Sequence, residues 1–468
     1  MKKQFEDTYG HTHMLTKQLG EAGGQGVVFR TMDPDLAVKL IHNSAKTDVS
    51  TDTSKNRRYA ELRFLPLPDW VNLTLPRAEL KDAAGYVMTL LDDMQEFGEA
   101  FTPNDASGGM TNPWLDGMRA ANAEFADFIS GYMATGGARR RLGAYLGAAR
   151  VLSALHAKGL VYCDFSGRNC FVSTVPGNDT VWLIDADNLS FAEAISKDAV
   201  CTDRYAAPEV IQRGRFSPWS DCYSFAISLF EDLMCTHPFM GALQEQDFGE
   251  DDFADDTEAR AFRGDFPWIC DQDDDSNSGD YGLAEQREMV LTNRLFRLFD
   301  RTFSETGRKK RKTRPTMPEW FFALAEALDG SIRCRRCGMD FDVSLDKCPW
   351  CDTVPRVVSL ESLKGGSPLW KFAREAVDGA ALRVPARLIR GPRPSARDEA
   401  AFTIRCGKDG VCISDMNPGY DWAVSLDGGG SFQDIFGRVD IPSGSLVRCA
   451  GAEPDNAVRI EVKIREQR

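Results

Sequence analysis

Two carboxylates and one amide in the middle of the chain have the types and spacing of a metal site. Asp164 and Asn169 lie five residues apart between short apolar segments, and Asp185 directly follows the apolar run Val181–Ile184. Hard cations such as Mg²⁺ take oxygen ligands, typically one or two carboxylates together with phosphate oxygens. The pattern therefore predicts a magnesium site built by residues at the ends of strands.

A glycine-rich segment and a lysine near the N-terminus add groups that bind phosphate. Four glycines fall within seven residues, namely Gly20, Gly23, Gly24 and Gly26. Glycine lets backbone amides approach a phosphate closely. Lys39 lies in the apolar run Ala37–Ile41, where burying a lysine is costly without an anionic partner. We expect Glu61, on a helix predicted near residues 55–65, to be that partner and to aim Lys39 at the phosphates.

Strands followed by helices must position these groups. Before residue 95, short apolar runs flank turn signals such as Asp33-Pro34-Asp35, which predicts strands joined as hairpins. Beyond about residue 115 the pattern becomes helical, because apolar residues between 142 and 155 recur at spacings of three and four. A second buried helix is expected near residues 223–233.

These segments, in this order, resemble the protein-kinase superfamily. Asp164 matches the Asp of the catalytic loop, Asn169 the metal-binding Asn of that loop, and Asp185 the Asp of the D-F-G motif. The resemblance implies that Asp164 accepts or orients the proton of the substrate hydroxyl, and that Asn169 and Asp185 hold Mg²⁺.

Three later motifs extend the resemblance. Residues 205–209 resemble the A-P-E motif, residues 221–226 resemble the start of the helix that anchors the catalytic loop, and Arg314 resembles the late arginine that pairs with Glu209. The implied fold is α+β and bilobal. We expect a tail over residues 1–13, a kinase-like domain over 14–330, a β-rich N-lobe over 14–95 and a helical C-lobe over 96–330.

The implied function is an ATP- and Mg²⁺-dependent protein kinase that transfers the γ-phosphate to Ser or Thr of a partner protein, with Tyr as the less favoured alternative. Besides the four glycines and Lys39, the resemblance assigns Val28, Met88 and Leu90 to nucleotide binding. Arg168, four residues after Asp164 as in tyrosine kinases, would steady the γ-phosphate during transfer.

The chain departs from the family pattern at two motifs. The H-R-D triplet reads Tyr-Cys-Asp and ends at Asp164, so the arginine that normally pairs with an activation-loop phosphate is missing. Phosphorylation of Thr202 is therefore not expected to be the activating switch. The D-F-G motif reads Asp-Ala-Asp and ends at Asp187, which is either a spare metal ligand or, as we favour, a cap on the next turn.

Two C-x-x-C pairs lie ten residues apart, formed by Cys334, Cys337, Cys348 and Cys351. This spacing predicts a closed, structural Zn²⁺ site with four thiolates, in a ribbon over residues 331–355. A kinase followed by such a ribbon resembles bacterial kinases of tellurite-resistance-type stress systems. Those kinases occur beside a von Willebrand A protein and a PP2C phosphatase, which the resemblance implies as partners.

The remaining segments carry less information. We expect an acidic, solvated insertion at about residues 243–282, a linker over 356–399 and a β-rich interaction module over 400–468. The chain has 468 residues and a net charge of −14, which argues against nucleic acid as the main partner. It shows neither an apolar run of membrane-spanning length nor a signal peptide, so we expect a cytoplasmic protein without a membrane partner.

Two other functions remain open. One is a pseudokinase scaffold that binds nucleotide without catalysis, although Lys39, Asp164, Asn169 and Asp185 are all present. The other is a small-molecule kinase, which is disfavoured because such enzymes normally lack the A-P-E motif.

Overall fold

The computed structural model describes residues 3–20, 26–43, 48–103, 112–195, 201–245, 254–364, 367–395, 399–428, 430–450 and 458–465. The chain divides into two compact units. The first comprises Met1–Ala100 and Val151–Ser228, and the second Phe101–Arg150 and Leu229–Arg468. None of the helices in the described part of the chain has the length and apolarity that a membrane crossing needs.

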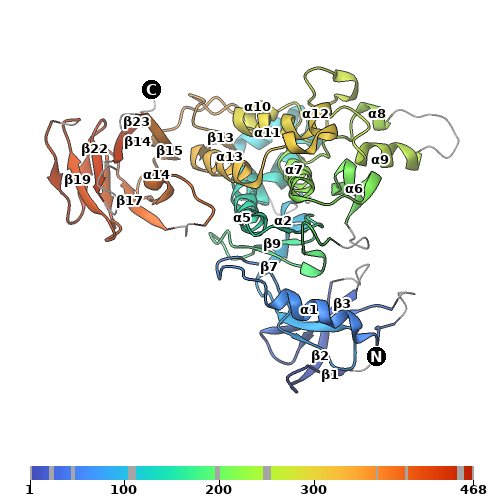
Figure 1. The fold of residues 1–468 in the computed structure, drawn as a ribbon. Coiled ribbons are helices and arrows are strands. Elements are labelled where there is room, and N and C mark those ends of the chain that lie inside the picture. The colour runs from blue at the N-terminus through green and yellow to red at the C-terminus, as the bar shows by residue number, and fades with distance from the viewer. Residues whose placement is uncertain are drawn as a thin grey trace. The chain divides into compact units, whose positions relative to one another are not determined.

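A six-stranded antiparallel sheet, in the order β1-β2-β3-β4-β6-β5, forms the N-terminal part of the first unit. Its strands are β1 (Gln4–Glu6), β2 (Thr12–Leu19), β3 (Gly26–Thr31), β4 (Leu36–Ile41), β5 (Ala78–Glu79) and β6 (Gly85–Thr89). Alternating residues of β3 and β4, including Phe29 and Val38, form its apolar core. Helix α1 (Asn56–Arg63), preceded by the short 3-10 helix η1 (Thr53–Lys55), lies beside this sheet (Figure 1).

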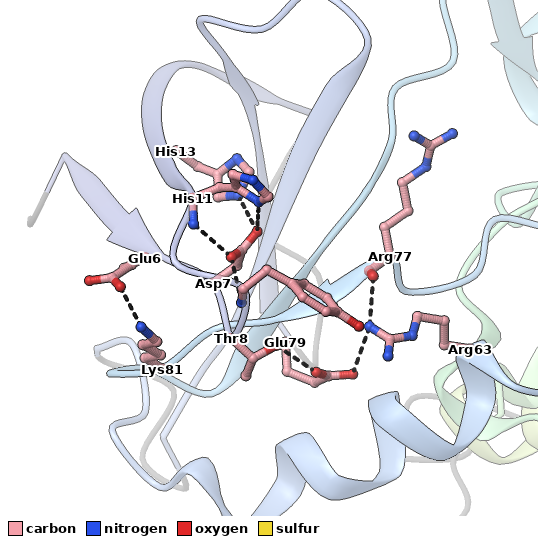
Figure 2. Close-up of polar contacts among 10 residues, drawn as sticks. Glu6, Asp7, Thr8, His11, His13, Arg63, Arg77, Glu79 and Lys81 are labelled. Atoms are coloured by element: carbon pink, nitrogen blue, oxygen red, sulfur yellow. Dashed lines mark hydrogen bonds and ion pairs between the residues drawn. The ribbon is translucent and has the colours of Figure 1, made fainter.

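The expected tail over residues 1–13 is wrong, because β1 forms the edge of this sheet. Phe5 pairs with His13 of β2 and packs into the apolar core. Asp7 fixes the turn between the two strands, since its Oδ1 accepts hydrogen bonds from the backbone N–H groups of Tyr9 and His11, both at 2.9 Å. Figure 2 shows this carboxylate beside His11 and His13. A three-residue strand leaves too short a pattern to recognise in the sequence.

The rest of the first unit consists of short strands and helices around the catalytic loop, defined as residues 162–169. A three-stranded sheet has the order β10-β9-β7, and β11 pairs with β8. The strands are β7 (Met94–Glu96), β8 (Leu160–Val161), β9 (Cys170–Ser173), β10 (Val181–Leu183) and β11 (Ser190–Phe191). The helices are α2 (Phe97–Phe101), η2 (Ala186–Asn188), η3 (Asp203–Tyr205) and α6 (Pro208–Arg213). Two long helices, α5 (Gly137–Ala157) and α7 (Pro218–Met234), have residues in both units.

The second unit contains a helical part with an aromatic core. Its helices are α3 (Pro113–Ala121), α4 (Ala123–Ala134), α8 (Ala242–Glu245), α9 (Ala254–Phe262), η4 (Asp275–Asn277), α10 (Arg287–Val290), α11 (Asn293–Phe303), α12 (Glu305–Lys309), η5 (Arg311–Thr313) and α13 (Met317–Gly330). Phe230 packs edge-on against Trp268, Phe299 and Phe303, with ring centroids 5.2–6.0 Å apart. Such contacts are favourable for aromatic rings beyond their burial.

The expected acidic insertion at about 243–282 is only partly a solvated segment. Residues 246–253 lie outside the described residues. Farther along, Trp268 and Asn277 are fully buried. The Asn277 amide donates hydrogen bonds to the carbonyls of Phe239 and Pro267, at 3.1 and 2.7 Å. This part of the segment is therefore integral to the core, despite its acidic neighbours.

The predicted linker over residues 356–399 is also wrong, because it supplies much of a two-sheet β domain. One sheet has the order β15-β14-β23-β22-β19-β20 and the other the order β16-β17-β18-β21. The elements are β14 (Val357–Lys364), β15 (Ser367–Glu375), β16 (Ala381–Pro385), α14 (Arg387–Arg390), β17 (Ala400–Cys406), β18 (Val411–Ser414), β19 (Asp421–Ser425), β20 (Gln433–Asp434), β21 (Val439–Ile441), β22 (Leu446–Ala450) and β23 (Val458–Arg465). Apolar residues of both sheets, such as Leu360 and Ile404, share one core.

A buried ion pair joins this β domain to α13. Asp329, near the end of α13, is fully buried and accepts hydrogen bonds on Oδ1 and Oδ2 from the Arg387 guanidinium, both at 2.6 Å. Its Oδ2 also accepts the indole N–H of Trp370 at 2.8 Å. Because a buried carboxylate needs such partners, α13 and the β domain stabilise each other.

Candidate active site

Lys39 lies in the centre of the N-terminal sheet, on β4, opposite Val28 of β3 and Tyr86 of β6. Its ammonium group contacts Asp185 Oδ1 and, at 2.7 Å, Asp187 Oδ2. Burial alone would lower the pKa of this amine, but the charges of Asp187 and Asp185 outweigh it and raise the pKa above its ordinary value. Lys39 is therefore held as a cation against two carboxylates.

The expected pair between Lys39 and Glu61 is wrong for this structure. The Glu61 side chain is 63% exposed and forms an ion pair with Arg57, one helical turn earlier, at 3.4 Å. The nearest anions to Lys39 come from the segment after β10 instead. Glu61 was predicted from its place on a helix after the lysine, and the face that it presents was not evident from the local sequence.

Asp187 is not the cap on the next turn that we favoured from the sequence. The N-terminal cap position of η2 is Asp185, and Asp187 lies inside that turn. Its Oδ2 binds Lys39 and its Oδ1 accepts a hydrogen bond from the Tyr86 hydroxyl at 2.8 Å. Both oxygens of Asp187 are therefore engaged by protein groups.

Asp164 has hydrogen-bond partners on both carboxylate oxygens. Oδ1 accepts the backbone N–H and the hydroxyl of Thr202, at 3.0 and 3.2 Å. Oδ2 accepts the Asn169 amide at 3.1 Å, and the same amide donates to the Asp164 carbonyl at 2.8 Å. Burial raises the pKa of Asp164, although the bonds from Thr202 and Asn169 oppose the shift. The structure thus brings Asp164 and Asn169 together, as the spacing predicts.

The backbone of the catalytic loop is held by the carboxylate of Asp221, at the start of the helix that the resemblance assigns to anchoring this loop. Asp221 of α7 is buried and accepts the backbone N–H groups of Tyr162 and Cys163, at 2.8 and 2.9 Å. It also lies 2.9 Å from His156 Nε2. Cys163 has a φ of 74° and Asp185 a φ of 55°, a conformation that costs free energy for non-glycine residues. Strain therefore lies at two positions of the site, beside Asp164 and at Asp185.

The glycines assigned to nucleotide binding are only partly described. Gly23 and Gly24 lie outside the described residues. Gly20 directly follows β2 and has a φ of 63°, and Gly26 begins β3. A Cβ atom on Gly26 would lie 2.3 Å from the Leu40 carbonyl oxygen, so the close approach of β3 to β4 requires glycine there.

The other residues assigned to ATP lie on or beside the same sheet. Val28 is the neighbour of Lys39 on β3, and Met88 on β6 is opposite Ala37. The N–H of Leu90, just after β6, donates to the Asp35 carbonyl at 2.9 Å. Arg168, in the catalytic loop, is exposed.

The four clustered cysteines converge as their spacing predicts. Their sulfur atoms all lie within 4.8 Å of one another, with Sγ–Sγ distances of 3.6 Å for Cys334–Cys351 and 3.5 Å for Cys337–Cys348. Four thiolates at about 2.3 Å from a tetrahedral ion would be roughly 3.8 Å apart. The geometry fits one tetrahedral metal ion and is too open for disulfides.

Comparison with known proteins agrees with this geometry over part of the chain. Residues 122–276 match the family model of the protein kinase domain. A stretch of 103 residues is 31% identical to a probable serine/threonine-protein kinase, PBL4, of Arabidopsis thaliana, covering 20% of this chain. The chain spans only 24% of that relative's length. The matched part of the chain, which contains Asp164, Asn169 and Asp185, is therefore similar to the protein kinase domain.

Proposed function

We propose that the chain is an ATP- and Mg²⁺-dependent protein kinase that transfers the γ-phosphate to Ser or Thr of a partner protein, with Tyr as the alternative acceptor. One observation carries the proposal. One carboxylate oxygen of Asp164 accepts a hydrogen bond from the Thr202 hydroxyl, and the other accepts one from the amide of Asn169, the proposed metal ligand. A carboxylate in hydrogen-bond reach of a hydroxyl has the geometry that a catalytic base requires.

Each residue of the set has a role in this reaction. Asp185 and Asn169 would hold Mg²⁺, which supplies positive charge that offsets the charge developing on the phosphates. Lys39 would bind the α- and β-phosphates of ATP. Asp164 would orient the substrate hydroxyl and take its proton, and Arg168 would steady the γ-phosphate. The kinase-domain match contains Asp164, Asn169 and Asp185, which supports these three assignments.

The finer expectations complete the proposal. We propose that the four cysteines hold a structural Zn²⁺, because four thiolates leave no open position for substrate. A bilobal arrangement and partnership with a von Willebrand A protein and a PP2C phosphatase in a bacterial stress response follow from the resemblance alone, and a cytoplasmic location follows from the sequence pattern alone. They remain proposals of the same kind.

The test compares wild type with Asp164→Asn and with Asp378→Asn, a matched control on an exposed residue of the β domain. Each protein is incubated with γ-labelled ATP, Mg²⁺ and cell lysate. We expect labelled substrate protein with wild type and Asp378→Asn, and a loss of at least a hundredfold with Asp164→Asn. Equal labelling by all three proteins would refute the catalytic assignment. Nucleotide binding without labelling would favour the scaffold instead.

A further inference from the structure

We propose that Asp187, and not Glu61, is the residue that positions Lys39 for phosphate binding. The inference rests on the proposed kinase function and deepens it. It assigns a positioning role to the last residue of the Asp-Ala-Asp motif, where the family pattern has glycine.

Asp187 and Lys39 form a close, buried ion pair. Asp187 Oδ2 lies 2.7 Å from the Lys39 ammonium, and the two side chains are 7% and 8% exposed. A cation that is buried to this degree needs an anion that is equally fixed. The Glu61 side chain is 63% exposed and is therefore not fixed by burial.

Asp187 is itself held in place by Tyr86. The Tyr86 hydroxyl donates to its other oxygen at 2.8 Å. Tyr86 lies on β6 directly opposite Lys39 on β4. Neighbouring strands thus present the lysine and the tyrosine side by side, and one carboxylate bridges them. Such a closed arrangement restricts the lysine to few rotamers.

The two aspartates of the motif differ in exposure and in how fully their oxygens are engaged. Both oxygens of Asp187 are engaged by Lys39 and Tyr86, whereas the Asp185 side chain is 27% exposed. Asp185 also contacts the Lys39 ammonium through Oδ1. Its side chain is the more exposed of the two and is therefore the one accessible to a metal ion, whereas Asp187 holds Lys39 from a buried position in which both of its oxygens are engaged.

Helix α1 is connected to the same segment without Glu61. The Arg58 guanidinium donates to the carbonyls of Asp187 and Leu189, at 3.0 and 2.5 Å, and to the Ser190 hydroxyl at 3.0 Å. A shift of α1 would therefore move the backbone that carries Asp187. The helix can influence the lysine through Arg58.

The test measures kcat and KM for ATP in Asp187→Asn, Asp187→Glu and Glu61→Gln. Asparagine keeps the acceptor for Tyr86 but turns an amide donor toward the Lys39 ammonium. We expect Asp187→Asn to raise KM for ATP by roughly tenfold or more, with a smaller change in the KM for protein substrate. Asp187→Glu should recover part of this loss, and Glu61→Gln should change KM for ATP by less than about twofold. The same loss in Glu61→Gln as in Asp187→Asn would overturn the proposal.

A double-mutant cycle separates this proposal from the proposed function. Lys39→Met, Asp187→Asn and the double variant are unfolded in urea without nucleotide. We expect the effects of the two substitutions on the unfolding equilibrium constant to be non-additive by roughly tenfold. Additive effects would overturn the role of Asp187. Failure of the wild type to bind or use ATP, with the coupling intact, would refute the kinase function alone.

Discussion

We expect Asp221→Asn to loosen the catalytic loop while leaving the contacts of Lys39 intact. Asp221 accepts the N–H groups of Tyr162 and Cys163 and lies beside His156. In the best orientation of asparagine, Oδ1 still accepts the N–H of Cys163. The amide then faces His156, which can accept in its other tautomer, and the N–H of Tyr162, which loses its acceptor.

The free-energy cost follows from the number of donors that lose their acceptor. One buried N–H without an acceptor costs about 1–3 kcal/mol, so Asp221→Asn should cost about 2 kcal/mol. Asp221→Ala removes the acceptor for all three donors and should cost about 4 kcal/mol, a large part of the stability of a typical domain. The φ of 74° at Cys163 adds to the strain that the loop must bear.

Hydrogen exchange of the Tyr162 and Cys163 amides measures the loosening of the catalytic loop directly. A loss of about 2 kcal/mol should speed their exchange by roughly 30-fold in Asp221→Asn. Because Asp164 directly follows Cys163 in the chain, kcat should fall more than KM for ATP changes. Ser224→Ala, which removes one hydrogen bond to the Ser220 carbonyl within α7, is the control for general loosening of the helix.

Unchanged exchange at these two amides in Asp221→Asn would refute this account of the loop. Equal acceleration in Ser224→Ala would refute it as well, because the effect would then belong to α7 as a whole.

Three further outcomes are expected. Thr202→Glu should lower kcat at least tenfold, because its carboxylate would lie against Asp164, which now accepts the Thr202 hydroxyl at 3.2 Å; higher activity would contradict this. Cys348→Ser should reduce bound zinc from about one ion per chain, measured by elemental analysis, and should lower the melting temperature; a wild type free of zinc would contradict the assignment. Burial raises the pKa of Asp232 to about 7 from an ordinary value of 3.8, so this carboxyl destabilises the fold progressively as the pH rises from about 4 to 7. Asp232→Asn should therefore raise the melting temperature at pH 8 and change it little at pH 4, and an equal shift at both pH values would refute the assigned pKa.

The sequence indicated the catalytic loop well because its information is local. The five-residue spacing of Asp164 and Asn169 is enough to bring the two side chains together, and the structure shows them 3.1 Å apart. The convergence of the four clustered cysteines was predicted on the same local basis, since each C-x-x-C turn defines its own geometry. Local spacing therefore predicted the groups that act within one turn or one loop.

The predictions that are wrong concern residues that only the tertiary structure brings together. The bond of Lys39 to Asp187 depends on contacts between residues 148 positions apart. The predicted linker became a sheet because β14 pairs with β23, about a hundred residues later. The tail became an edge strand through three paired residues. None of these pairings has a signal in the residues next to it.

The ion pair between Asp329 and Arg387 has a consequence for how this chain can vary in evolution. A gene rearrangement that joined α13 to another C-terminal module would leave the Asp329 carboxylate buried or exposed without its guanidinium and indole donors. Loss of one partner of a buried pair typically costs about 3–5 kcal/mol. Natural variants of this architecture should therefore exchange the β domain together with α13, or change Asp329 at the same time.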